Sequence, residues 1–145
     1  MSSAMSNLLQ QAAQLYSQGR FAEAEQACKK VLNKMPKNAD ALHVCGLTFL
    51  QRNITDKAVT FLEKAFKAAK DNEQIKSNYV HALYAHANNL AAGSARYAES
   101  LPFFDLALKY RPRFPEALNN RGMALLELKK YTEAEKNFKK LLDIA

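Results

Sequence analysis

A recurring spacing of 34 residues constrains the fold of this 145-residue chain more than any other feature. Gly46 follows Ala12 at this distance, and Ala58 follows Ala24 at the same distance. A fixed period of this length is typical of proteins that stack one small supersecondary unit repeatedly. We therefore expect an array of repeats in which each repeat packs mainly against its neighbours.

Two helices are predicted within each period, an A helix followed by a B helix. The apolar residues recur at spacings of three and four, which is the pattern of a helix with one buried face. Pro36 and Pro112 follow B segments, and proline ends a helix there. Gly46 and Gly122 lie inside A segments, where glycine costs about 1 kcal/mol relative to alanine. We expect a close approach of the B helix to offset that cost.

These landmarks divide the chain into repeats. We treat it as one domain with four repeats, at residues 5–38, 39–72, 73–114 and 115–145. The third repeat exceeds the period, and its surplus falls in the sequence AHANNLAAGSAR. Alanine-rich sequence favours a lengthened A helix, and Gly93 and Ser94 favour a loop after it. Pro102 predicts that the following helix starts late, near Ser100, or bends.

The composition excludes several other classes of protein. Four glycines and four prolines are too few for a sandwich or barrel of many short strands. No apolar run approaches the roughly 18 residues of a membrane span, and the N-terminus has no signal-peptide pattern. Cys28 and Cys45 are the two cysteines, and two do not make a secreted disulfide framework. We therefore expect a cytoplasmic protein without a membrane association.

The formal net charge of +7 raises the question of an acidic or nucleic-acid partner. The lysines fall mainly on B helices or their ends, where they suit a solvated outer face and the helix dipole. The arginines are scattered at turns and helix starts, whereas a nucleic-acid surface needs a contiguous basic stripe with stacking aromatics. We expect no nucleic-acid binding.

No arrangement of residues in the sequence points to catalysis or to a metal. The chain lacks the HExxH, GxxxxGK[ST] and GxSxG patterns and any Cys/His cluster with zinc spacing. We interpret His43, His81 and His86 as surface or groove residues. Cys28 and Cys45 fall on packing positions, where a thiol acts as a small hydrophobe. We therefore expect no enzymatic activity, no cofactor and no metal site.

The periodic residues resemble the pattern of the tetratricopeptide repeat family, in which a large residue precedes Leu-Gly and Tyr, with Ala, Phe and Pro later. The matching residues in three copies are Leu8, Ala12, Leu15, Ala24, Cys28 and Pro36; Leu42, Cys45, Gly46, Phe49, Ala58 and Leu62; and Leu118, Gly122, Leu125, Ala134 and Phe138. The resemblance covers essentially the whole chain. It implies an all-α, right-handed solenoid of antiparallel helix pairs that binds other proteins.

The same resemblance implies a concave groove lined by the A helices. The family's ligand-contact positions give as peptide-binding candidates Gln10, Tyr16, His43, Leu47, Asn78, His81, Tyr84, Asn119, Asn120 and Met123. Further groove positions are Leu9, Ala13, Asp40, Val44, Leu50, Ser77, Glu116 and Glu127. Chaperone-binding members hold a terminal carboxylate with Lys and Asn on the first repeat. The corresponding residues here are Leu9 and Ala13, so a carboxylate clamp is not expected.

Asn78 and Asn120 occupy the same groove position in the third and fourth repeats. In this respect the chain is similar to the N-terminal repeat arrays of bacterial O-GlcNAc transferase-like multidomain proteins, where an asparagine ladder bonds an extended peptide backbone. An amide suits that task because it both donates and accepts hydrogen bonds. The alternative is that each asparagine is an ordinary hydrated polar residue. If both hold a peptide, alanine at both should weaken binding and leave the melting temperature nearly unchanged.

Two classes of function stay open. We favour a protein-interaction module that binds a peptide segment in the groove. The alternative is a structural role, either as a self-association segment or as a spacer in a larger transferase-like protein. The last repeat stops before its expected proline without a polar capping helix, which solenoids usually need. We expect Leu142 or Ile144, with an exposed flank of Leu125 and Leu128, to form an apolar patch that supports a weak homodimer.

Overall fold

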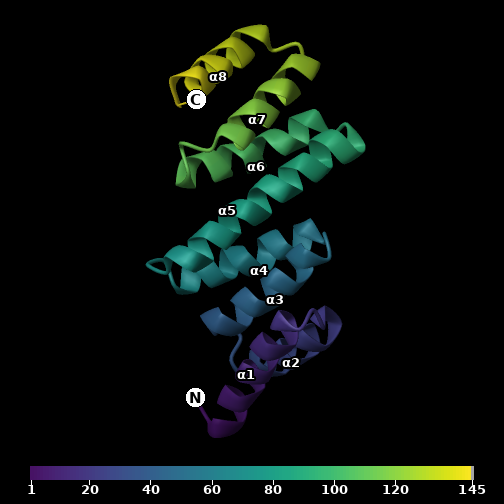
Figure 1. Cartoon of the computed structure of the whole chain (residues 1–145), viewed down its shortest axis with the longest axis vertical. Helices are drawn as coiled ribbons and strands as arrows, with labels where there is room; N and C mark the ends of the chain where they lie inside the picture. Colours follow the sequence, from purple (N-terminus) through teal and green to yellow (C-terminus); the bar gives the residue numbers. More distant parts are fainter. Residues whose placement is uncertain (145) are drawn as a thin grey trace. The chain divides into compact units, whose positions relative to one another are not determined.

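The computed structural model describes residues 1–144, whose regular secondary structure is entirely helical (Figure 1). The elements in chain order are α1 (Ser3–Ser17), α2 (Phe21–Lys34), α3 (Ala39–Gln51), α4 (Thr55–Ala68), α5 (Glu73–Asn88), the π-helix η1 (Asn89–Gly93), α6 (Tyr97–Tyr110), α7 (Pro115–Glu127) and α8 (Tyr131–Ile144). The predicted all-α class is confirmed. The A helices α3, α5 and α7 begin at Ala39, Glu73 and Pro115, which are the first residues of the second, third and fourth repeats.

Contacts divide the chain into two compact bodies, Met1–Ala82 and Leu83–Ala145, and the division falls inside α5. We name them the N-terminal body and the C-terminal body and describe each by itself. Leu62 and Ile75 are fully buried in the first, and Phe104 is fully buried in the second. The single domain expected from the sequence stays a prediction. Among the described residues, no helix combines the length and the apolar character needed to cross a membrane.

The turns between A and B helices repeat one backbone conformation. The second residue after each A helix has a positive φ, at Gly19, Asn53, Ala95 and Lys129. After Gly19, the N–H of Arg20 donates to the carbonyl of Leu15 at 2.9 Å, which satisfies a group that the end of the helix leaves free. Gly19 and Asn53 are 34 residues apart, and so are Ala95 and Lys129. The period seen in the sequence therefore recurs in the turn geometry.

The surplus of the third repeat extends its A helix. After α5 the chain continues through the five-residue π-helix to Gly93, as the alanine-rich sequence predicted. Helix α6 then begins at Tyr97, so the predicted late start near Ser100 is wrong. Pro102 lies inside this helix and is exposed. Its missing N–H deprives only the carbonyl of Ala98, an exposed residue that water can reach, and the helix tolerates that loss.

Two glycines of A helices, Gly46 and Gly122, each face a large side chain of the B helix at very short range. A methyl carbon built on Gly46 would lie 2.6 Å from Cγ of Leu62, and one on Gly122 would lie 2.5 Å from Cζ of Phe138. Real side chains do not approach so closely, so only hydrogen fits at either position. The sequence-based expectation of a close A–B crossing is therefore confirmed in both bodies.

The expected exposure of Leu125 is wrong, because this side chain is fully buried. Leu125 follows Gly122 by three residues and Leu118 by seven, so all three lie on one face of α7. That face is the one against which Phe138 of α8 packs. Leu128 is half-buried and Leu126 is exposed, so the apolar flank of α7 lies one residue away from the predicted position.

Replacing Gly46 by alanine is expected to destabilise the protein by about 1–3 kcal/mol through overpacking against Leu62. The effect opposes the helix propensity of alanine, which favours the change by about 1 kcal/mol. Gly122→Ala should cost less, because Phe138 is half-buried and its ring can turn outward. Urea unfolding followed by circular dichroism measures both.

Gly93→Ala is the matched control, because nothing lies within 4 Å of a methyl carbon built there. This variant should be as stable as the wild type or slightly more stable. If Gly46→Ala unfolded at the same urea concentration as Gly93→Ala, the close crossing would not be what requires glycine.

Candidate functional site

A hollow of about 430 Å³ lies on the A helices of the N-terminal body, and we name it the N-terminal hollow. Its lining residues are Met1, Ser6, Leu9, Gln10, Ala13, Asp40, His43 and Val44. All except Met1 and Ser6 stand at groove positions taken from the repeat pattern. The hollow forms because α1 and α3 pack side by side. The peptide-binding candidates Gln10 and His43 therefore share one surface.

His43 is a half-buried polar residue of this hollow, and Asn78 fixes its ring. The two side chains pair through Nδ2 of Asn78 and Nε2 of His43 at 2.8 Å. Because the amide nitrogen is a donor, Nε2 accepts and the imidazole is neutral, with its proton on Nδ1. Burial lowers the pKa of His43, and the nearby carboxylate of Asp40 opposes that shift only in part. The hydrogen bond and the lowered pKa thus agree on the neutral form.

A second hollow of about 430 Å³ lies in the C-terminal body, and we name it the C-terminal hollow. Its lining residues are Asn88, Ala91, Ala92, Tyr97, Asn120, Met123, Ala124 and Glu127. The candidates Asn120 and Met123 share it. The sequence interpretation missed Asn88, Ala91 and Ala92, which come from the end of α5 and the π-helix. The signal was present, because a lengthened A helix also lengthens the wall of a groove that A helices line.

Asn120 is held by its neighbours across this hollow. Its Nδ2 donates to Oδ1 of Asn88 at 2.9 Å and to the hydroxyl of Tyr84 at 3.1 Å, which uses both amide hydrogens. Its Oδ1 accepts from Nδ2 of Asn119 at 3.3 Å. The ring of Tyr84 in turn packs against Phe114, with centroids 4.8 Å apart.

These bonds change the expectation for alanine variants. Removing the amide of Asn78 or of Asn120 breaks internal hydrogen bonds that are each worth about 0.5–1.5 kcal/mol. The melting temperature is therefore expected to fall, which revises the prediction of an almost unchanged value. A peptide backbone in the C-terminal hollow would meet the carbonyl oxygen of Asn120 rather than its N–H groups.

The remaining candidates line neither hollow. Tyr16 packs its ring against Phe21, with centroids 5.5 Å apart, and its hydroxyl accepts from Nε2 of Gln51 at 3.2 Å. Leu47 is half-buried and His81 is exposed. Their role in binding stays a prediction.

The two hollows have a common electrostatic character. Neither lining contains a lysine or an arginine, and each contains one carboxylate, Asp40 in the first and Glu127 in the second. The rest is amide, hydroxyl, imidazole and apolar surface. Such a lining can donate to and accept from a peptide backbone and can hold small apolar side chains. Within residues 1–144, no group of three or more His, Cys, Asp or Glu side chains is placed to bind a metal ion.

The two cysteines are buried and unlinked. The neighbouring thiol of Cys45, together with burial, raises the pKa of the Cys28 thiol. The Sγ of Cys28 donates to the backbone carbonyl of Glu25 at 3.3 Å. A protonated, buried thiol is a poor nucleophile, so Cys28 serves packing.

The tetratricopeptide repeat profile matches residues 15–87, and a second profile of the same description matches residues 115–145. The human protein DnaJ homolog subfamily C member 7 is 38% identical over 56 residues, which are 39% of this chain and 11% of that protein. This chain thus spans about a tenth of the length of that curated relative.

Solved structures of repeat proteins show the same fold at low identity. MamA (MSR-1) is 20% identical, with a TM-score of 0.67 over 99% of this chain and 80% of that chain. YrrB, described as a TPR protein with an unusual peptide-binding site, is 19% identical, with a TM-score of 0.63 over 94% of this chain and 66% of that chain. These likenesses concern the fold alone.

Acidification is expected to destabilise the protein through His43. Because its pKa is lowered in the folded state, the unfolded chain takes up the proton first, near pH 6.5. The stability that neutral His43 contributes is therefore present above that pH and is lost as the pH falls through the folded-state pKa. Protonation also removes the acceptor of Asn78, a bond worth about 0.5–1.5 kcal/mol.

The measurement is urea unfolding at pH 7.5 and pH 5.0, with a histidine NMR titration of the folded protein. His43→Gln is the control, because glutamine offers an acceptor oxygen and does not titrate. The wild type should lose more stability between the two pH values than this variant. An NMR titration that placed the pKa of His43 above 6.5 would contradict the assignment.

Proposed function

The chain belongs to the tetratricopeptide repeat family, whose fold is that of a protein–protein interaction module, and we propose that its A-helix hollows bind an extended peptide segment of a partner protein. The observation that carries the proposal is that two hollows of similar size lie on A helices, one in each body. The N-terminal hollow is built largely from the positions at which the repeat pattern places ligand contacts. YrrB, a protein of the same fold, is described as having a peptide-binding site.

The lining defines the chemistry of the peptide. Each hollow has one carboxylate and no lysine or arginine side chain, so a neutral or basic segment is favoured over an acidic one. The alanines of the walls leave room for small or medium apolar side chains. The amide oxygen of Asn120 and the side chain of Gln10 line the hollows and would bond a peptide backbone.

Two further features belong to the same proposal. The module acts without catalysis, as expected of a repeat fold that serves protein–protein interaction. It acts in the cytoplasm, where buried neighbouring thiols such as Cys28 and Cys45 stay reduced.

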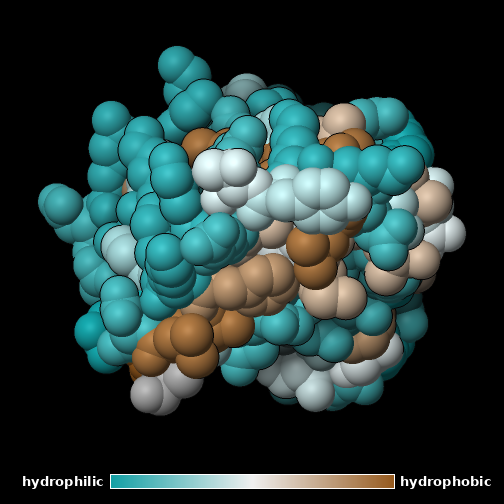
Figure 2. Space-filling view, turned by 90° about the horizontal axis from the view of Figure 1, so that it is seen from above, coloured by the Kyte–Doolittle hydropathy of each residue, from teal (hydrophilic) through white to brown (hydrophobic). Residues whose placement is uncertain are grey.

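We also propose weak self-association, the alternative role considered from the sequence. Apolar side chains gather in a band among hydrophilic ones on the face shown in Figure 2. In the C-terminal body Leu142 is 74% exposed and Leu126 is 39% exposed. Burial of such a side chain gains at most about 1.5–3 kcal/mol. The gain from two of them does not exceed the entropy cost of association by much, so the dimer would be weak.

Filling a hollow should abolish peptide binding without unfolding the protein. Ala13 and Ala92 line the N-terminal and C-terminal hollows and are exposed, so tyrosine is tolerated at either position. Peptides selected on the wild type from a random display library should bind Ala13→Tyr or Ala92→Tyr about tenfold or more weakly, because the added ring occupies the space of a ligand side chain. Fluorescence anisotropy with the selected peptides measures the affinities.

Ala22→Tyr and Ala98→Tyr are the matched controls, since both alanines are exposed on B helices outside the hollows. They should bind within about twofold of the wild type. Selected peptides that bound all four variants equally well would show that neither hollow is the binding site.

Self-association should be concentration-dependent and should depend on Leu142. Sedimentation equilibrium of the wild type is expected to show dimers between micromolar and millimolar protein, and Leu142→Glu should be monomeric throughout. Lys140→Glu, an exposed change on the same helix, is the control and should behave as the wild type. A wild type that stays strictly monomeric at millimolar concentration would rule the dimer out.

A further inference from the structure

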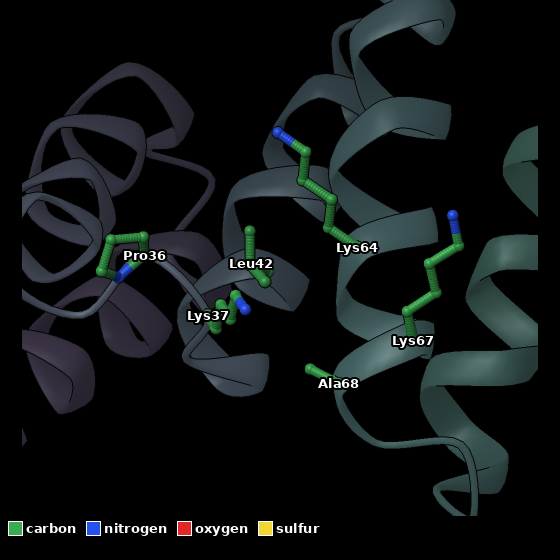
Figure 3. A pocket seen from close by; sticks show the side chains of 6 residues that line it. All are labelled: Pro36, Lys37, Leu42, Lys64, Lys67 and Ala68. Carbon is green, nitrogen blue, oxygen red and sulfur yellow. The ribbon is translucent and has the colours of Figure 1, made fainter.

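A pocket outside both hollows combines cations with an apolar floor, and we name it the lysine pocket. Its volume is about 480 Å³, and its lining residues are Pro36, Lys37, Leu42, Lys64, Lys67 and Ala68. Figure 3 shows Pro36, Lys37 and Leu42 on one side and the α4 residues on the other. All six belong to the N-terminal body. The lining contains three lysines and no acidic residue, which is the opposite charge pattern to that of the hollows.

Stabilisation of helix α4 accounts for only one of the three lysines of this pocket. Lys67 lies in the last turn of α4, where a cation suits the helix dipole, and it pairs with Glu63 at 2.8 Å. Lys37 lies in the loop after α2, and Lys64 lies a full turn before the end of α4. Neither forms an ion pair within the described residues. Lys64 instead places its ammonium 6.0 Å from the ring centre of Phe61. Two charges of this pocket therefore have no anionic partner of their own.

The floor of the pocket is the edge of a packed apolar cluster. Leu42, Ala65 and Ile75 form this cluster, with Phe61 and Phe66 packed against it. The adjoining loop is held in place, because the side chain of Asn38 accepts from the N–H of Ala41 at 2.9 Å. Proline at position 36 restricts it further. The pocket is thus preformed, which lowers the entropy cost of binding.

We propose that the lysine pocket docks an acidic peptide segment that carries one large apolar side chain. The apolar side chain would contact Leu42, Pro36 and Ala68, and flanking carboxylates would pair with Lys37 and Lys64. A volume of this size holds one leucine-sized side chain with part of its backbone. This site does not depend on the hollows, and its ligand has the opposite charge to theirs.

The floor favours a peptide over other polyanions. A single-stranded nucleic acid binds through bases stacked on aromatic rings, and no aromatic side chain lines this pocket. Its three cations are lysines, which suit single carboxylates, whereas arginines form the paired bonds preferred for phosphate. An apolar floor of this kind binds an apolar side chain, and neither a phosphate backbone nor a lipid headgroup carries one.

The test is fluorescence anisotropy with the labelled peptide acetyl-EEDLEE-amide and the full chain at low salt. Each exposed ion pair is worth up to about fivefold in affinity, so Lys37→Glu/Lys64→Glu should weaken binding by about tenfold or more. Ala68→Glu keeps both lysines and places a carboxylate on the wall, and it should weaken binding similarly. Lys136→Glu/Lys140→Glu makes the same change of net charge outside the pocket and should leave the affinity within about twofold.

Changes in the peptide distinguish docking in the pocket from non-specific electrostatic attraction. Replacing its leucine by serine should weaken binding about tenfold, and 300 mM salt should weaken it further. The proposal is overturned if the serine peptide binds as well as the leucine peptide, or if Lys136→Glu/Lys140→Glu weakens binding as much as the pocket variant. It is also overturned if a twelve-residue oligouridylate or phosphatidylserine vesicles bind more tightly than the peptide and depend on the same lysines. Circular dichroism of each variant checks that it is folded.

Discussion

The close crossing of the A and B helices is the constraint on which the rest of the structure depends. At Gly46 and Gly122 the A helix presents no side chain, and Leu62 and Phe138 of the B helices occupy the space. The B helix therefore covers one face of the A helix tightly and leaves another face open. The hollows lie on that open face. Lys64 and Lys67 of the B helix α4 and Lys37 of the loop after α2 lie outside the hollows, so one small chain carries two surfaces of opposite charge.

The sequence predicted what depends on local pattern. Apolar spacing identified eight helical segments, and Gly46 and Gly122 indicated the crossings, because each of these signals comes from residues close together in the chain. Tertiary effects were missed. Pro102 suggested a late helix start, yet a proline costs little where the carbonyl it deprives is exposed. The hydrogen bonds of Asn120 to Asn88 and Tyr84 join residues more than 30 positions apart, and no local sequence pattern predicts them.

The polar groups of the A helices show how such a surface is kept both rigid and usable. Asn78 orients His43, and Asn88 and Tyr84 orient Asn120. No buried side-chain nitrogen or oxygen of residues 1–144 lacks a hydrogen-bond partner. Because these groups are already positioned, a ligand that bonds their remaining lone pairs does not have to order them first. The cost is that the same residues contribute to folding, so affinity and stability cannot be altered independently at these positions.

The π-helix after α5 has a consequence for how this architecture diversifies. Ala95 follows Asn53 by 42 residues, whereas the neighbouring turn residues keep the shorter spacing, so the extra length is absorbed before the turn and the next repeat resumes normally. A π-helical segment takes up additional residues without ending the helix. Insertions of residues at this point thus alter the wall of the C-terminal hollow, at Asn88, Ala91 and Ala92. They leave the helix crossing at Gly122 undisturbed. Recognition can evolve at this place under a selective pressure separate from the one that maintains the scaffold.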